Sequence, residues 1–445
     1  MRYQRLFLLC AIIIAAFLPQ SSHACTTFCL DTPDELVVGK NFDWHTGDAL
    51  VVVNKRNVAK TAYLYPDWIG EQPAGWTSKY GSVTFNPWGR EFPFSGMNEA
   101  GLVVSAMGLG TTEYPIPDER PAISAFQWIQ YQLDTAATVA NVIASDAVLR
   151  INNSDFWRLH FFICDSLGNC ASIEFLDGVL VVHQTVQGTM PVKVLTNNSY
   201  SKDIEYWENE EIPVPDVYSS AQRFCTAAEM LEDYDPETSG PAINYTFNIL
   251  SNLKWFAPTQ WSIAYDAQHR RINFYTLGNG DIRYFDMNSF DFSCQTPVRV
   301  LDIQEDLSGN VAGDFIDYTY ELNRNLIDRT LSSEMFPEFT GEARKAYAAY
   351  PETTECMGAC ALDIRHRKIR SSKLFKPRKV VLKISGDEDF DMYSRIDLGP
   401  LTWRKAFFNR KKNRLKVQAI VPAGLRPGIV PILVGDCFGE MEVLP

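Results

Sequence analysis

The most reactive combination of groups in this chain would arise at Cys25, if the chain is cut after Ala24. A cysteine with a free α-amino group carries a thiol nucleophile and a base on the same residue. An α-amine titrates near pH ~7.7 to 8.0, so it can accept the thiol proton and later deliver it to a leaving amine. The alternative is that Cys25 forms half of an ordinary disulfide, and this stretch alone favours neither interpretation.

The first 24 residues have the three-part pattern of a secretory signal peptide. Arg2 and Arg5 precede an apolar run from Leu6 to Leu18, which is too short to span a bilayer in the usual way. Small residues then surround the predicted cut. A lipoprotein signal also ends in cysteine, but it requires an aliphatic residue three positions before that cysteine, where this chain has Ser22. The pattern therefore predicts an exported protein, periplasmic or secreted.

Composition limits the partners and cofactors that we expect. The net charge of -13 becomes -15 when Arg2 and Arg5 are removed, which argues against nucleic acid or an anionic membrane as the partner. The six histidines are scattered and no paired C-x-x-C occurs, so we expect neither a metal nor a cofactor. The sequence leaves open whether the protein forms a homo-oligomer.

An odd number of cysteines would remain after cleavage. Ten are present and Cys10 lies in the signal, so nine are left and one thiol is left over. We predict that Cys25 is that thiol. Up to four disulfides could form among the other eight, although Cys29 and Cys225 could equally be buried thiols. Cys164 and Cys170 flank a predicted hairpin turn and could bridge across it.

The elements that must position Cys25 are strands. Residues 25–30 and 36–44 read as two strands joined by a turn, so the mature N-terminus should lie in a sheet. Blocks of strands then alternate with pairs of helices, which predicts an α+β layered domain. Strands are expected at 81–85, 91–97, 101–107, 161–164, 170–175, 259–265, 271–276 and 281–285, and helices at 123–133, 135–147, 219–234, 241–253 and 314–331.

The chain divides into four predicted segments. Residues 1–24 are the signal peptide and 25–334 the large domain; 335–378 are read as an irregular linker. Residues 379–445 have β patterns separated by Gly, Pro and Asp, which predicts a small β-sandwich-like module. The sequence does not reveal what this module does.

Six short motifs follow one another along the large domain. They are Cys25-Thr26-Thr27-Phe28, Gly39-Lys40-Asn41-Phe42-Asp43-Trp44, Gly96-Met97-Asn98-Glu99-Ala100-Gly101-Leu102, Leu195-Thr196-Asn197-Asn198, Ser220-Ala221-Gln222-Arg223-Phe224 and Thr259-Gln260-Trp261-Ser262. In this order they resemble the choloylglycine hydrolase and penicillin V acylase family, from Cys25 to about Phe292. Each motif is weak alone, and the ordered set is specific.

The resemblance implies a fold and a set of roles. The fold would be the four-layer αββα sandwich of the N-terminal nucleophile hydrolases. Cys25 would be the nucleophile, and Asp43 would orient its amine. Asn197 would be a side-chain donor to the oxyanion, and Arg223 a cation that favours the thiolate; these are the parts that such a reaction needs.

Each of these residues also has a purely structural interpretation. Asp43 could cap a turn, Asn197 could hold a loop, and Arg223 could be a solvated charge. Arg223 lies near the start of its predicted helix, where the dipole does not favour a cation, which points to a specific partner.

Two positions depart from the family pattern. Lys40 stands where the family usually has Arg, and it keeps the charge without the planar fork. Gly108 stands where many members have Asn or an aromatic residue. Its backbone N–H could still donate to the oxyanion, but a side-chain contact with substrate is lost.

The sequence thus predicts an exported cysteine amidase acting on linear, non-peptide amides. By resemblance, the substrates would be small N-acyl compounds such as penicillin V, conjugated bile acids or acyl-homoserine lactones. Trp68, Trp76 and Trp88 could line an acyl pocket or simply pack in the core. The alternative function is that of a non-catalytic binding protein on the same scaffold.

Overall fold

A computed structural model describes most of the chain from Cys25 onward. The described residues are 25–65, 68, 70–209, 219–253, 258–332, 336–337, 339–358, 360–365, 367–371, 377–386, 390, 396–409, 412–423, 425–435 and 437–444. The predicted signal peptide, residues 1–24, lies outside them. Within these ranges no helix is both long and apolar enough to cross a membrane.

Cys25 directly precedes the first strand of a seven-stranded sheet. β1 and β2 form an antiparallel hairpin in which Thr26 pairs with Asn41, so the predicted hairpin is confirmed. The strands in spatial order are β14 (Val194–Leu195), β1 (Thr26–Asp31), β2 (Leu36–Asp43), β15 (Thr259–Asp266), β16 (Arg271–Thr276), β17 (Arg283–Asp286) and β19 (Gly309–Asn310).

A second sheet has nine strands. Its centre is a meander in which β11 pairs with both β8 and β12. The order is β13 (Val179–Gln184), β12 (Cys170–Leu176), β11 (Leu159–Cys164), β8 (Val103–Gly108), β7 (Ser95–Asn98), β6 (Ser82–Asn86), β3 (Leu50–Asn54), β18 (Arg299–Asp302) and β20 (Ile316–Asp317). Smaller pairings join β21 (Glu355–Cys356), β4 (Val58–Thr61) and β5 (Gly75–Thr77), and β9 (Ala122–Ile123) with β10 (Arg150–Ile151).

The two large sheets face each other through buried side chains. Thr27 on β1 and Ser105 on β8 share a hydrogen bond of 2.9 Å between their hydroxyls. Tyr265 on β15 and Ser95 on β7 are joined in the same way at 2.7 Å. These polar contacts are embedded in one continuous apolar core, to which both sheets contribute. The N-terminal hairpin is therefore held rigidly between the sheets.

Helices contact the two sheets separately. α2 (Ala125–Thr135) and α3 (Val139–Ala144) contact the nine-stranded sheet, whereas α5 (Ser220–Glu232) and α6 (Ala242–Asn252) contact β1, β14, β2 and β15 of the seven-stranded sheet. Ser124, Thr138 and Ser219 cap three of these helices with their side chains. α4 (Tyr200–Glu208), α7 (Tyr320–Thr330) and α8 (Gly341–Ala349) complete the set. Of these seven helices in the described ranges, α4 and α8 were not predicted from the sequence.

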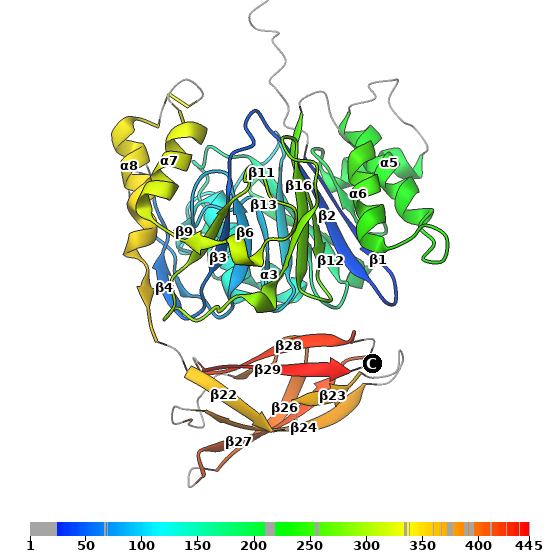
Figure 1. Cartoon of the computed structure of the whole chain (residues 1–445), viewed down its shortest axis with the longest axis vertical. Helices are drawn as coiled ribbons and strands as arrows, with labels where there is room; N and C mark the ends of the chain where they lie inside the picture. Colours follow the sequence, from blue (N-terminus) through cyan, green and yellow to red (C-terminus); the bar gives the residue numbers. More distant parts are fainter. Residues whose placement is uncertain are drawn as a thin grey trace, which may run out of the picture.

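The last part of the chain folds around a core of its own. Residues 360–445, called the C-terminal module below, contain β22 (Cys360–Arg365), β23 (Lys368–Arg370), β24 (Arg378–Gly386), β25 (Ile396–Asp397), β26 (Thr402–Asn409), β27 (Arg414–Val421), β28 (Gly428–Val434) and β29 (Cys437–Leu444). Their buried residues form a separate cluster that begins at Leu362. Figure 1 shows the module beneath the large domain, with β28 and β29 as its strands nearest to that domain.

The predicted irregular linker at 335–378 is wrong in two respects. It contains α8, which Thr340 caps by accepting a hydrogen bond from the Ala343 N–H. It also contains β22 and β23, which pair in parallel with β29 and belong to the C-terminal module. The module therefore starts near residue 360, because its first strand, β22, lies between β29 and β24 of the same sheet.

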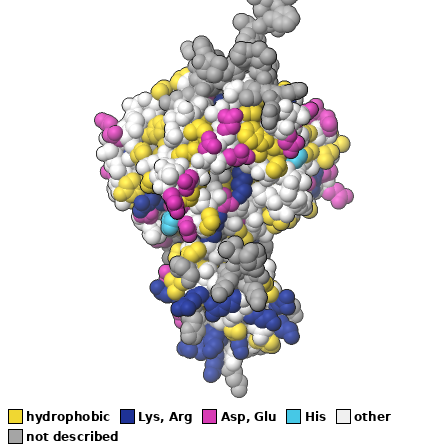
Figure 2. All heavy atoms as spheres, turned by 90° about the vertical axis from the view of Figure 1, so that its right-hand side faces the viewer, with side chains coloured by type: hydrophobic (Ala, Val, Ile, Leu, Met, Phe, Trp, Pro, Cys, Tyr) yellow, Lys and Arg dark blue, Asp and Glu magenta, His cyan; other side chains and the backbone are white. Residues whose placement is uncertain are grey.

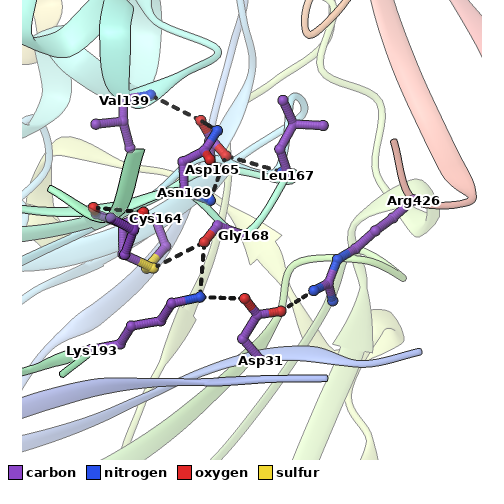
Figure 3. Close-up of a disulfide and its surroundings, with 11 residues drawn as sticks. Asp31, Val139, Cys164, Asp165, Leu167, Gly168, Asn169, Lys193 and Arg426 are labelled. Carbon is purple, nitrogen blue, oxygen red and sulfur yellow. Dashed lines mark hydrogen bonds and ion pairs between the residues drawn. A yellow bond between two sulfur atoms is a disulfide. The ribbon is translucent and has the colours of Figure 1, made fainter. Parts of the chain in front are cut away.

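Three arginines join the module to the large domain. Arg426 forms an ion pair with Asp31 at the end of β1, and Lys193 forms another with the same carboxylate (Figure 3). Arg270 donates a hydrogen bond of 2.7 Å to the carbonyl of Ile429 on β28. The Arg56 guanidinium lies 3.7 Å from the centre of the Phe438 ring. β1, which directly follows Cys25, thus ends at the junction between the large domain and the module.

The structure confirms part of the prediction about disulfides and free thiols. The predicted Cys164–Cys170 disulfide is present, and it bridges directly opposite positions of the β11–β12 hairpin. A second disulfide joins Cys294 to Cys356, and Cys437 is also disulfide-bonded. Cys25, Cys29 and Cys225 are free and buried.

Candidate active site

Cys25 is almost completely enclosed by the described part of the chain, with 1% of its surface exposed. Burial raises the pKa of its thiol, and the cation of Lys40 is the strongest influence in the opposite direction. The backbone N–H of Asp43 donates a hydrogen bond to the sulfur, and Arg223 also favours the thiolate. The sulfur therefore lies in a closed pocket with two cations and a backbone donor.

Asp43 ends β2 next to Cys25. Its Oδ1 accepts a hydrogen bond of 2.6 Å from the Thr259 hydroxyl on β15. Its Oδ2 is buried and has no hydrogen-bond partner among the described residues. Burial raises the pKa of Asp43 to about 6, against the effects of Arg223, Thr259 and Lys40. An ionised oxygen without a partner at this depth is costly, so it marks a place for a cationic or hydrogen-bonding group.

Arg223 connects three parts of the site. Its Nη1 donates to the Cys25 carbonyl at 2.9 Å and to the Thr26 hydroxyl at 2.6 Å. Its Nη2 donates to Oδ1 of Asn197 at 3.0 Å. The side chain is buried, and burial lowers the pKa of its guanidinium. The specific partners inferred from its position near the helix start are therefore present, whereas a solvated charge is excluded.

Asn197 follows β14 and is fixed at three atoms. Its backbone N–H donates to the Ser220 hydroxyl at 2.8 Å, and its Oδ1 accepts from Arg223. Because Arg223 can only donate, the amide must point its Nδ2 the other way, where it donates to the Gly108 carbonyl at 2.8 Å. One hydrogen of the amide is then left for another acceptor in the pocket.

Gly108 ends β8 beside this amide. A Cβ atom added at this position would meet only the Asn197 Nδ2, at 3.7 Å, among the described residues. That distance is an ordinary van der Waals contact. The space that a larger residue would occupy is therefore open at the side of the site next to Asn197.

Lys40 contributes more than the sequence indicated. Its Nζ donates to the Ala106 carbonyl on β8 at 2.5 Å and lies 4.8 Å from the centre of the Phe94 ring. Burial lowers the pKa of Lys40 to about 8, although Cys25 and Asp43 both favour its charged form. The Lys side chain thus places a cation near the Cys25 sulfur.

A buried network of hydrogen bonds holds the residue before Asn197, Thr196, in place. His160 lies between Glu174 and the carbonyl of Thr196, with ring nitrogens 2.9 Å from the Glu174 Oε1 and 2.8 Å from the carbonyl oxygen. The Thr196 hydroxyl donates to Asp203 at 2.6 Å. Neither His160 nor Glu174 was singled out from the sequence, where no pattern ties them to the motif residues.

The structure brings together all five residues that the sequence selected, which are Cys25, Asp43, Gly108, Asn197 and Arg223. Thr259 and Ser220 also belong to the site, although neither was given a role. Both lie inside the quoted motifs, so the signal was available. A cavity of about 240 Å³ opens next to Cys29 on β1, but none of the five lines it.

The tryptophans proposed for an acyl pocket lie in the core. Trp88 stacks on Phe126 with ring centres 4.5 Å apart, and Trp76 donates to buried Asp134 at 2.7 Å. Trp68 is also buried, and its ring lies 5.0 Å from that of Tyr65. The core-packing interpretation accounts for these contacts.

The model of the linear amide C-N hydrolases, choloylglycine hydrolase family, matches residues 25–300, more than half of the chain. The chain belongs to this family. The match begins at Cys25 and ends before the C-terminal module. Membership places the protein among the hydrolases of linear amide C–N bonds and confirms the resemblance seen in the six motifs.

Individual relatives agree with the family assignment. The penicillin V acylase of Pectobacterium atrosepticum is 27% identical over 266 residues, which cover 53% of this chain and 67% of the relative. The solved penicillin V acylase of Agrobacterium tumefaciens is 25% identical, with a TM-score of 0.56 over 66% of this chain and 98% of its own. A conjugated bile acid hydrolase variant from Clostridium perfringens, 18% identical, has a TM-score of 0.52 over 64% and 98% of the two chains and shows the shared α+β fold.

Proposed function

We propose that the protein is an exported amidase whose nucleophile is Cys25, made N-terminal by removal of residues 1–24. The observation that carries this proposal is the buried Asp43 Oδ2, which has no partner among the described residues of the uncut chain. Because Thr26 pairs with Asn41, Cys25 lies across the β1–β2 hairpin from Phe42, one position from Asp43, and cleavage would turn its amide nitrogen into an amine there. The carboxylate could then hold that amine and orient it towards the thiol.

In the first half of the proposed reaction, the α-amine takes the Cys25 proton and the thiolate attacks the substrate carbonyl. The oxyanion that forms accepts hydrogen bonds from the free hydrogen of the Asn197 amide and from the backbone N–H of Gly108. When the tetrahedral intermediate collapses, the C–N bond breaks and the α-ammonium gives its proton to the leaving amine. The acyl group remains on sulfur as a thioester.

In the second half, water replaces the thiol. The α-amine takes a proton from water, the hydroxide equivalent attacks the thioester, and the same oxyanion donors act again. Cys25 leaves as the thiolate and recovers its proton. Lys40 and Arg223 stabilise the thiolate at both stages, since each cation lowers the pKa of Cys25. No cofactor or metal takes part in these steps.

The fold supports this proposal at a finer level than family membership. Two sheets that share buried polar contacts, each contacted by its own helices, are consistent with the four-layer αββα sandwich of N-terminal nucleophile hydrolases. By likeness to the acylases and the bile acid hydrolase, the substrates would be small N-acyl amides, among them penicillin V, conjugated bile acids and acyl-homoserine lactones. The open space beside Gly108 bears on which acyl group fits.

The rival proposal is a non-catalytic binding protein on the same scaffold. Intact-mass measurement of the exported protein, combined with thiol labelling under denaturing conditions, separates the two. The amidase requires a chain that starts at Cys25 with an unmodified thiol. A mature chain that starts elsewhere, or a disulfide at Cys25, would favour the binding protein.

A further inference from the structure

The two parts of the chain carry opposite charge. Residues 360–445, the C-terminal module, contain 18 Lys and Arg against 9 Asp and Glu, a net charge of +9. Since the whole chain has a net charge of -13, residues 1–359 carry -22. The overall acidity, from which the sequence argued against an anionic membrane, therefore does not describe the module. A partner of the module should be judged from the module's own surface.

Three cations face one another across neighbouring strands of the module. Arg365 on β22 is paired with Lys383 on β24, and Lys383 with Lys416 on β27. Directly opposite residues in an antiparallel sheet point to the same side, and like charges placed there destabilise the sheet. All three side chains are exposed, and none forms an ion pair with a described residue. Asp363, two residues before Arg365 on β22, lies on the same side of the sheet but forms no ion pair with any of the three.

The same surface carries more cations and two exposed apolar side chains. Following the alternation along each strand, the surface formed by Arg365, Lys379, Val381, Lys383, Lys405, Phe407, Arg414 and Lys416 is called the basic face below. Phe407 lies opposite Lys416 and is 53% exposed, and Val381 is 45% exposed. Buried residues such as Leu382 and Val417 point the other way, into the module core.

The basic face points away from the large domain. Figure 1 places β24 and β27 on the far side of the module, with β28 and β29 between them and the rest of the chain. In Figure 2 the Lys and Arg side chains gather on this lower end, while acidic side chains are spread over the large domain above. The molecule is therefore electrically polarised along its long axis.

We infer that the basic face binds the anionic headgroups of a lipid surface. The cations spread over four strands and form a two-dimensional array, which matches a surface better than the single groove that a linear polymer would follow. Phe407 and Val381 lie among them and could enter the interface, where aromatic and apolar side chains are favoured next to Lys and Arg. Repulsion of the acidic large domain would keep the Cys25 site turned away from the surface.

A solvated, protective surface is the competing explanation. β26 is an edge strand, and lysines and a bulge at Trp403/Lys405 are common ways to protect an edge from aggregation. That explanation covers Lys405 but does not cover Lys383 and Lys416, which lie on the internal strands β24 and β27. Cations facing each other at internal positions cost stability without protecting an edge.

The test is co-sedimentation of the mature full-length protein with vesicles. We expect binding to phosphatidylcholine mixed with phosphatidylglycerol, none to phosphatidylcholine alone, and loss of binding at high salt. The double variant Lys383→Gln/Lys416→Gln should weaken partitioning roughly thirtyfold, at about fivefold per cation. Phe407→Ser should weaken it several-fold and leave the salt dependence unchanged.

A matched control removes two exposed cations from the large domain, Lys202→Gln/Lys345→Gln, and should leave vesicle binding unchanged. The basic-face variant should keep its amidase activity and an unreduced Tm, because it relieves a repulsion. The inference is overturned if the wild-type protein does not bind anionic vesicles. It is also overturned if the control pair weakens vesicle binding as much as the basic-face variant does. Binding to single-stranded DNA that anionic vesicles fail to compete would instead assign the face to a soluble polyanion.

Discussion

The Nη2 of Arg223 donates a hydrogen bond of 3.0 Å to Oδ1 of Asn197, while Nη1 of the same guanidinium holds the Cys25 carbonyl at 2.9 Å. One side chain thus fixes the backbone of the candidate nucleophile and the orientation of the candidate oxyanion donor. The geometry explains why a buried arginine is required here, since a planar fork can serve two acceptors at once whereas an ammonium is a point charge.

Arg223→Lys should therefore lose most of its activity although the charge is kept. With the Asn197 amide free to turn, we expect kcat to fall by about 10² to 10³, as for the loss of an oxyanion donor, with a smaller change in KM. Steady-state kinetics measure this, and circular dichroism checks that the variant is folded. An unchanged kcat in a folded Arg223→Lys enzyme would show that the fork is dispensable.

Asp43→Asn should separate activity from stability. The unfolded carboxyl has the lower pKa, so between pH 3.8 and about 6 the folded state of the uncut chain binds more protons and loses stability as the pH rises. Replacing the carboxylate should therefore stabilise the uncut chain near pH 7, by at most about 3 kcal/mol. In the mature enzyme the same variant should lose activity, because the amine loses its anionic partner. Urea denaturation at pH 4 and pH 7 and an amidase assay decide both points.

Lys40 should set the alkaline limit of activity. Its pKa of about 8 means that it loses its charge, and Cys25 its strongest cation, as the pH rises above 8. Lys40→Arg should extend the active range to higher pH, whereas Lys40→Met should lower kcat/KM throughout. A pH–rate profile of the three enzymes provides the comparison, and coincident alkaline limbs would contradict the role given to Lys40.

The same group predicts a change of stability with pH. Between pH 8 and the ordinary lysine pKa of 10.5, the unfolded chain binds more protons at Lys40 than the folded chain does, so folding becomes more favourable as the pH rises. The difference in unfolding free energy between wild type and Lys40→Met should change by up to about 3 kcal/mol across this window. A constant difference would mean that Lys40 is not held at a lowered pKa.

Gly108→Asn should change the preference for acyl groups. The position has room for a side chain, with 3.7 Å from a new Cβ to the Asn197 Nδ2, so we expect Tm to change little. The new amide would occupy the open side of the site and favour polar over bulky acyl groups. Ratios of kcat/KM across a series of N-acyl substrates measure this, and identical ratios in both enzymes would place substrate selection elsewhere.

The core of the site could be predicted because its residues occur in short ordered motifs. Cys25 and Arg223 are nearly two hundred positions apart, yet each lies in a recognisable string. The support behind Asn197 could not be predicted. His160 and Glu174 are adjacent only because β11 and β12 form a hairpin, and the contact of His160 with Thr196 depends on how the two sheets pack.

The large domain was predicted well where the apolar period was clear, as in β1, β2, α5 and α6. α4 was missed because it is polar over much of its length and follows directly after the Asn197 motif. The module boundary was placed too late because β23 pairs with β29, some 70 residues further along the chain, and β22 pairs with β29 and with β24. Pairing at that distance leaves no local signal.

The most direct test of the central claim is to trap the acyl group on the N-terminal residue. Mature enzyme would be mixed with an N-acyl substrate, quenched in acid and digested. The mass of the peptide that begins at Cys25 would then be measured by mass spectrometry. We expect a mass increase equal to the acyl group less one hydrogen, which is lost on treatment with hydroxylamine and is absent from Cys25→Ala. An active enzyme whose acyl group is found on any other residue, or a Cys25→Ala variant that keeps full activity, would contradict it.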